Sequence, residues 1–155
     1  MESTRRAALK GILAMGAMAA AVASGVLGAS RAFAAWNKGA FEAKSTLDAM
    51  RALGVANAED TNAIDIRAPD IAENGAVVPI DITSNIPGTT AISVFIEKNP
   101  FPYTGTFDFS QGAVPYVHLR VKIGESSPVR VVATAGGKHY TMAKEVKVTI
   151  GGCGG

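Results

Sequence analysis

Hydrophobic and polar positions alternate with a period of two along most of the chain beyond residue 58. Val78, Ile80 and Ile82 are separated by single polar or proline residues, and the same alternation recurs over 117–124 and 145–150. Successive side chains of a strand point to opposite faces, so this pattern predicts strands with one buried and one wet face. The predicted strands are 64–67, 76–83, 91–97, 106–109, 114–123, 128–135 and 138–150.

Turn residues separate these predicted strands. The segments 85–88, 99–102 and 124–128 combine proline with Asn, Gly or Ser, which favours turns. The segment 135–138 contains Gly136-Gly137 and predicts a tight hairpin. About seven short strands with this spacing predict a mostly β fold, an immunoglobulin-like β-sandwich. The chain has a single Cys, so it lacks the paired cysteines of an antibody domain.

A helical period precedes the strands. Apolar residues recur there at steps of four, three, four and three: Trp36, Ala40, Ala43, Leu47 and Met50. This spacing places them on one stripe of a helix, and Asp48 and Arg51 can pair on its outer side. Gly54 is a natural stop. We predict one short helix over 36–53, packed against the sandwich.

The first 34 residues have the composition of an export signal. Arg5 and Arg6 precede an uncharged apolar run over 11–29, and Ala32 and Ala34 form an A-x-A close. The paired arginines and the weakly apolar run resemble a twin-arginine signal, although Ala8 stands where that pattern commonly has Phe. We expect cleavage after residue 34 and a mature periplasmic protein without a membrane segment. A transmembrane anchor is the alternative, since the run is about long enough to span a bilayer.

Removing this signal changes the charge of the protein. The full chain has 15 Lys and Arg against 13 Asp and Glu, and cleavage would take four basic residues and one acidic residue, which leaves a net charge of −1. No basic block or basic–aromatic stripe remains in the mature part. This composition argues against nucleic-acid binding.

The pentapeptide 151–155 contains the only cysteine, Cys153, between Gly151-Gly152 and Gly154-Gly155. Glycine offers no side chain to bury, so ordering this segment costs entropy with little to offset it. We therefore predict three parts: the signal over 1–34, a domain over 35–150 and a flexible arm over 151–155. Five extended residues reach roughly 16–18 Å. The competing interpretations are a frayed tail and a cysteine that forms an intermolecular disulfide.

Other candidate chemistry is sparse. His118 and His139 each lie on a predicted strand and alternate with apolar neighbours, which is typical of solvated or partner-facing residues. No spacing of metal ligands and no phosphate-binding loop is present, so we expect no metal, no cofactor and no catalytic residue. A cysteine nucleophile needs an oriented base beside it, which a flexible arm cannot hold. The sequence thus predicts a reactive thiol without an active site around it.

A twin-arginine-like signal, a helix, a small sandwich and a terminal Gly-Gly-Cys-Gly-Gly together resemble the SoxY family, the sulfur carriers of periplasmic thiosulfate oxidation. The resemblance spans the chain, and the pentapeptide is its most specific part. It implies that Cys153 holds the substrate covalently and that the carrier forms a heterodimer with a SoxZ-like subunit.

The same resemblance implies three enzyme partners. A haem-containing enzyme would couple thiosulfate to the cysteine, a hydrolase would release sulfate, and a dehydrogenase would oxidise the remaining sulfane sulfur. Two other interpretations stay open: an exported binding or adhesion module with an incidental cysteine, and a thiol enzyme that acts alone.

Overall fold

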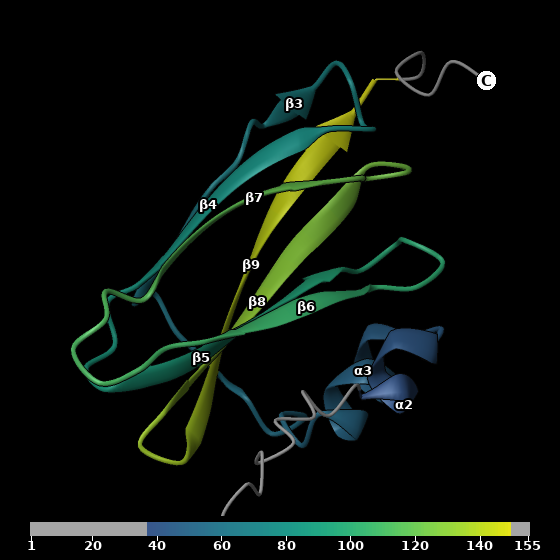
Figure 1. Ribbon diagram of the computed structural model, residues 1–155. Helices are drawn as coiled ribbons and strands as arrows, with labels where there is room; N and C mark the ends of the chain where they lie inside the picture. The colour runs from purple at the N-terminus through teal and green to yellow at the C-terminus, as the bar shows by residue number, and fades with distance from the viewer. Residues whose placement is uncertain (1–36, 150–155) are drawn as a thin grey trace, which may run out of the picture. The chain divides into compact units, whose positions relative to one another are not determined.

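Two β-sheets pack face to face in the computed structural model, which describes residues 37–149 (Figure 1). The strands of the large sheet run in the order β1 (Glu59–Asp60), β9 (Lys138–Val148), β8 (Ser127–Ala135), β5 (Thr89–Ile96) and β6 (Tyr103–Asp108), and β3 (Ile71–Ala72) also pairs with β9. The small sheet has the order β2 (Ile64–Arg67), β4 (Val78–Ser84) and β7 (Tyr116–Val121). The predicted mostly β, immunoglobulin-like sandwich is confirmed.

The core between the sheets consists of the alternating apolar residues of both. Ile80 on β4, Val94 on β5 and Val131 on β8 are completely buried there. Full burial of a Val or Ile side chain contributes about 1.5–3 kcal/mol. These side chains fix the registers of the strands, because a slip by one residue would turn them toward water.

A second, smaller core lies on the other side of the large sheet. The helices α2 (Lys38–Glu42) and α3 (Thr46–Ala52) contribute Ala40, Ala49 and Met50, and the sheet contributes Phe95 and Val132. Strand β5 is therefore buried on both faces, with Val94 pointing to one core and Phe95 to the other. The helices cover the large sheet and leave the outer face of the small sheet uncovered (Figure 1).

The prediction of one continuous helix is wrong, because the backbone breaks between the two helices. Ala43 is extended, with ψ of 136°, and the Ser45 side chain caps α3 by accepting a hydrogen bond from the Asp48 amide at 3.1 Å. Such a cap starts a new helix at that point. Leu47, expected on the buried stripe, is 48% exposed. The predicted pair of Asp48 and Arg51 is confirmed at 3.1 Å.

The hairpin predicted at 135–138 is confirmed. Ala135 pairs with Lys138, and Gly136 and Gly137 have φ of 57° and 76°, the left-handed region that a two-residue hairpin turn requires. Within residues 37–149, no helix is long and apolar enough to cross a membrane. The export signal with Arg5, Arg6, Ala32 and Ala34 lies outside the described residues, as does Trp36 of the predicted helix.

Candidate functional site: the root of the C-terminal arm

The arm predicted over 151–155 to carry chemistry follows β9 in the chain, with residues 149 and 150 between them. Its cysteine, Cys153, and the glycines Gly151, Gly152, Gly154 and Gly155 lie outside the described residues. The described part of the chain ends at Thr149, one residue beyond β9. We call Val148 and Thr149 the arm root, because they fix the place from which the arm leaves the sandwich.

One side of the arm root is hydrogen-bonded to the segment that contains β3. The Lys147 amide donates to the Asp70 carbonyl at 3.0 Å, and the Thr149 amide donates to the Ala72 carbonyl at 3.2 Å. Strand β3 thus runs parallel to the end of β9 and pairs with it. These bonds hold the chain in sheet geometry to the last described residue.

The other side of the arm root is held by Ser126. The Val148 amide donates to the Ser126 hydroxyl oxygen at 2.9 Å. The ladder between β8 and β9 begins at the pair of Ser127 and Val146, so the serine side chain extends it toward the arm. The amides of residues 147, 148 and 149 therefore each find an acceptor, on alternating sides of the strand.

Gly75 joins the arm root to the small sheet. Its carbonyl accepts a hydrogen bond from the Ile123 amide at 2.7 Å. A Cβ atom at this position would lie 2.4 Å from the Ile123 carbonyl oxygen and 2.8 Å from Val148 Cγ1, closer than real contacts allow. Only glycine fits this close approach of three chain segments. The end of β9 is therefore packed closely against the segments that precede β4 and follow β7.

An ion pair fixes the loop that precedes β3. Lys144 Nζ lies 3.2 Å from Asp70 Oδ1 and donates to the Ala68 carbonyl at 2.9 Å. The lysine side chain is only about one-third exposed, whereas the carboxylate is 89% exposed, so water screens the charge term. The main contribution of Lys144 is therefore to hold in position the loop whose carbonyls, those of Asp70 and Ala72, accept the hydrogen bonds from the end of β9.

His118 lies on the outer face of the small sheet, as predicted for a solvated strand residue. Its Nδ1 is 2.9 Å from Asp81 Oδ1, and the Tyr116 hydroxyl donates to the same oxygen. These bonds, that of Tyr116 first, lower the pKa of Asp81, and the carboxylate raises the pKa of Tyr116. The His118 side chain is 51% exposed. An imidazole in this position has no nucleophile beside it among the described residues.

His139 lies near the β8–β9 hairpin, at the opposite end of β9 from the arm root. Its Nδ1 is 3.0 Å from the Thr134 hydroxyl oxygen, across the ladder. The structure does not bring His118 and His139 together. In the segment 37–149, no three His, Asp or Glu side chains gather as metal ligands would.

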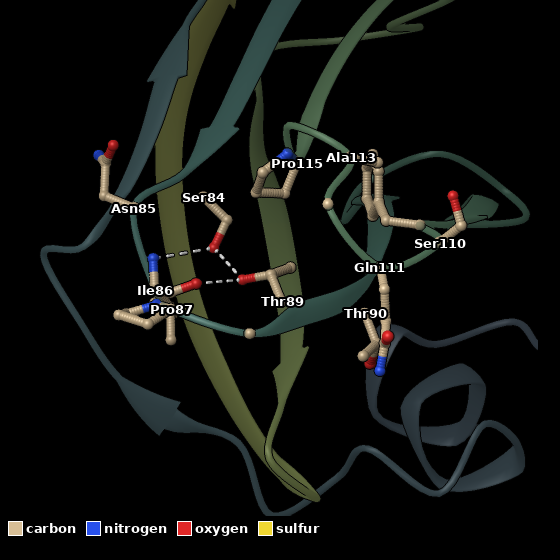
Figure 2. Close-up of a pocket in the computed structure, with 13 residues that line it drawn as sticks. Ser84, Asn85, Ile86, Pro87, Thr89, Thr90, Ser110, Gln111, Ala113 and Pro115 are labelled. Atoms are coloured by element: carbon tan, nitrogen blue, oxygen red, sulfur yellow. Dashed lines mark hydrogen bonds between the residues drawn. The ribbon is translucent and has the colours of Figure 1, made fainter.

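A depression of about 580 Å³ opens at the far end of the sandwich, between the β4–β5 turn and the loop before β7 (Figure 2). The Ser84 and Thr89 hydroxyl oxygens lie 2.7 Å apart, and Thr89 also donates to the Ile86 carbonyl at 2.7 Å. These polar groups satisfy one another, as the dashed lines of Figure 2 show. Since no ionisable side chain lines the depression, it offers no charge for a substrate and no base to activate its hydroxyl groups.

Sequence reasoning missed the residues that build the arm root. Two-residue strands such as β3 have no detectable period, and Asn74-Gly75 is typical of an ordinary turn. Ser126 falls in a segment that was predicted only as a turn. The alternation that ends at residue 150 did indicate that the last strand leads directly to the arm, and β9 with Thr149 agrees with it.

Comparisons with known proteins address the identity of the chain. The family model described as sulfur oxidation protein SoxY matches residues 49–153, more than half of the sequence. A solved structure of the sulfur carrier protein SoxY from Chlorobium limicola f thiosulfatophilum is 42% identical, with a TM-score of 0.60, and the alignment covers 67% of this chain and 96% of that one.

Two further results add nothing to the assignment. A chain from a structure on T cell activation by the superantigen toxic shock syndrome toxin-1 aligns at 16% identity with a TM-score of 0.40, over 56% of this chain and 99% of that one, which is too weak to support a conclusion. Among curated proteins, none matches significantly. The extent of the family match and the 42% identity establish that the chain belongs to the SoxY family of sulfur oxidation proteins.

Proposed function

We propose that this protein carries sulfur intermediates of thiosulfate oxidation as covalent adducts of Cys153 and presents them to partner enzymes. Family membership and the 42% identical Chlorobium sulfur carrier support a carrier role in sulfur oxidation. The observation that carries the assignment to Cys153 is that the family match runs to this residue, four positions beyond the rigid arm root.

The carrier chemistry needs a thiol and no catalytic group of the domain itself. Joining the Cys153 thiolate to the sulfane sulfur of thiosulfate forms an S–S bond and releases two electrons, which a haem-containing partner would accept. Hydrolysis of the terminal S–S bond would then release sulfate and leave a persulfide on the cysteine. A dehydrogenase would oxidise that sulfane sulfur. The domain's part is to hold a swinging arm that delivers one sulfur atom to several active sites.

The export route and the partner subunit belong to the same proposal. The segment with Arg5 and Arg6 favours export by the twin-arginine pathway, which places the carrier in the periplasm, where the oxidation would occur. We also propose a heterodimer with a SoxZ-like subunit. A small domain without an internal disulfide has a modest core, which a partner subunit can complete.

The decisive experiment compares adducts on the wild type and on Cys153→Ser, both purified from the native periplasm. Intact mass should show thiosulfonate or persulfide adducts on the wild type and none on the variant. A matched control combines Cys153→Ser with Ser110→Cys, which moves the thiol to an exposed position at the far end of the sandwich. That thiol should react with iodoacetamide and yet receive no sulfur from the enzymes. Sulfur adducts on Cys153→Ser would refute the proposal.

A further inference from the structure

The outer face of the small sheet changes in character from one end to the other. In its middle the charges are paired: Asp65 with Arg67 at 2.9 Å, and Asp81 with His118. Toward the arm root, the strands present Pro79 opposite Arg120. The face thus ends in an apolar and cationic area instead of a network of matched charges.

Two cations lie in this area. Arg120 and Lys122 are exposed and alternate with the buried Val121 and Ile123, so both point to the outer face. Neither forms an ion pair within residues 37–149. Glu73 and Glu125, on the flanking turns, form no ion pair with either cation. Both positive charges can therefore interact with a partner.

An exposed apolar side chain lies beside these cations. Val77 is 51% exposed, and it precedes Val78, which pairs with Val121 in the antiparallel ladder. The ladder ends at that pair, and Val77 and Lys122 are the next residues beyond it on the two segments. Val77, Pro79, Arg120 and Lys122 form what we call the docking patch.

The backbone of the docking patch is fixed. The Asn99 side chain donates to the Lys122 carbonyl at 2.8 Å and accepts from the Gly124 amide at 3.1 Å. A surface that is already ordered loses little entropy when a partner binds it.

The docking patch borders the arm root through shared contacts. Ile123, next to Lys122, donates to the carbonyl of Gly75, which lies two residues before Val77, and Gly75 is in contact with Val148. Cys153 follows Thr149 by four residues, which reach at most roughly 13–14 Å when extended. An enzyme that takes the cysteine into its active site must therefore bring the mouth of that site close to the arm root.

We propose that enzymes that receive the arm dock on this patch, and that the mouth of their active site presents an acidic rim around an apolar spot. The proposal rests on the carrier function and adds the surface that recognises the partner. Complementary rim charges mainly raise the rate of association and make it depend on salt. The apolar centre, Val77 and Pro79, would provide the contact that excludes water.

The test uses the thiosulfate-coupling haem enzyme from the same organism as the probe, with the mature carrier in its native assembly as substrate. Arg120→Glu/Lys122→Glu should raise the KM for the carrier by about tenfold, with kcat unchanged at saturation, because rim charges act on association. The salt dependence of kcat/KM should flatten in the variant. The rate of Cys153 alkylation by iodoacetamide should stay unchanged, which shows that the arm itself is intact.

Lys138→Glu is the matched control, because it reverses an exposed charge at the other end of β9. Ten residues of strand separate it from Val148, or roughly 33 Å. A KM for Arg120→Glu/Lys122→Glu equal to that of Lys138→Glu would refute the docking patch alone. Loss of the partner subunit on purification of the variant would also refute it, since the patch would then be a subunit interface. A wild-type carrier that the enzyme does not turn over would refute the proposed function and this proposal together.

Discussion

The two ends of the sandwich use glycine for different reasons. At the arm root, Gly75 has an ordinary backbone angle, but a Cβ atom there would collide with Ile123 and Val148. At the far end, Gly88 in the β4–β5 turn has φ of 73° and nothing within 4 Å of the place where a Cβ would stand. One position demands glycine because space is lacking, the other because of the backbone conformation.

The same contrast holds for hydrogen bonds and chemistry. At the end of β9, the amides of residues 147, 148 and 149 are each bonded to a neighbouring segment. The far end has a depression whose lining carries no ionisable group. For a carrier, the structured end is thus the one that anchors the arm, and a depression elsewhere is not evidence of an active site.

The largest difference between the two ends should be in the loss of stability when a glycine is replaced by alanine. Gly75→Ala should destabilise the protein by about 3 kcal/mol, since the clash is with backbone and with a core side chain. Gly88→Ala should cost about 1 kcal/mol, the penalty of a left-handed residue without a clash. Urea unfolding of both variants measures the difference.

Gly75→Ala should also displace the arm root, so sulfur loading of the folded variant should slow, whereas Gly88→Ala should load at the wild-type rate. Equal stability losses in the two variants would contradict the idea that the arm root is the tightly packed end.

A smaller loss of stability should follow from removing the hydroxyl group of Ser126. Ser126→Ala takes away the acceptor of the Val148 amide, and a typical hydrogen bond contributes about 1 kcal/mol. Hydrogen exchange of the Val148 amide should accelerate, because the ladder would end one bond earlier. Ser110→Ala, at the exposed far end, is the control and should leave that exchange rate unchanged. An unaltered Val148 rate in Ser126→Ala would show that the serine does not hold the arm root.

The β-sandwich could be predicted from sequence because the alternation of hydrophobic and polar residues is visible within each strand. Val78, Ile80 and Ile82 indicated the buried face of β4, and the structure buries all three completely. The helix prediction was wrong because a stripe of apolar residues fits one helix or two, and only the cap at Ser45 distinguishes them. A Ser followed three residues later by an acidic residue was the signal available for that cap.

The arm root could not be predicted because it depends on segments far apart in the chain. Gly75, Ile123 and Val148 meet only once both sheets are formed, and the parallel pairing of β3 with β9 leaves no trace in either segment. The role of Cys153 as an attachment site, in contrast, could be proposed from sequence alone, since that proposal rests on residue type and on neighbours in the chain.

The smallest expected difference between the two ends concerns pH. The arm root is held by amides, carbonyls and a hydroxyl, none of which titrates, whereas the middle of the small sheet carries the Asp81 carboxylate bound by Tyr116 and His118. The pKa of Asp81 lies below its ordinary value of 3.8, so its contribution to stability is present above pH 3.8 and is lost as pH falls through the lowered pKa. The pKa of Tyr116 lies above 10.0, so its contribution is present below pH 10 and is lost as pH rises through the raised pKa.

Asp81→Asn should therefore flatten the stability profile at both extremes and change little between them, where the 37% exposed side chain of Asp81 is screened by water. Hydrogen exchange can locate the effect: at acid pH the variant should alter protection of the Thr83 amide and leave that of Val148 unchanged. Asp108→Asn, which removes a carboxylate that forms no ion pair within residues 37–149, is the control and should leave the Thr83 profile as in the wild type. A pH response at Val148 that Asp81→Asn abolishes would mean that the two ends are coupled through the small sheet, and the separation between them would have to be given up.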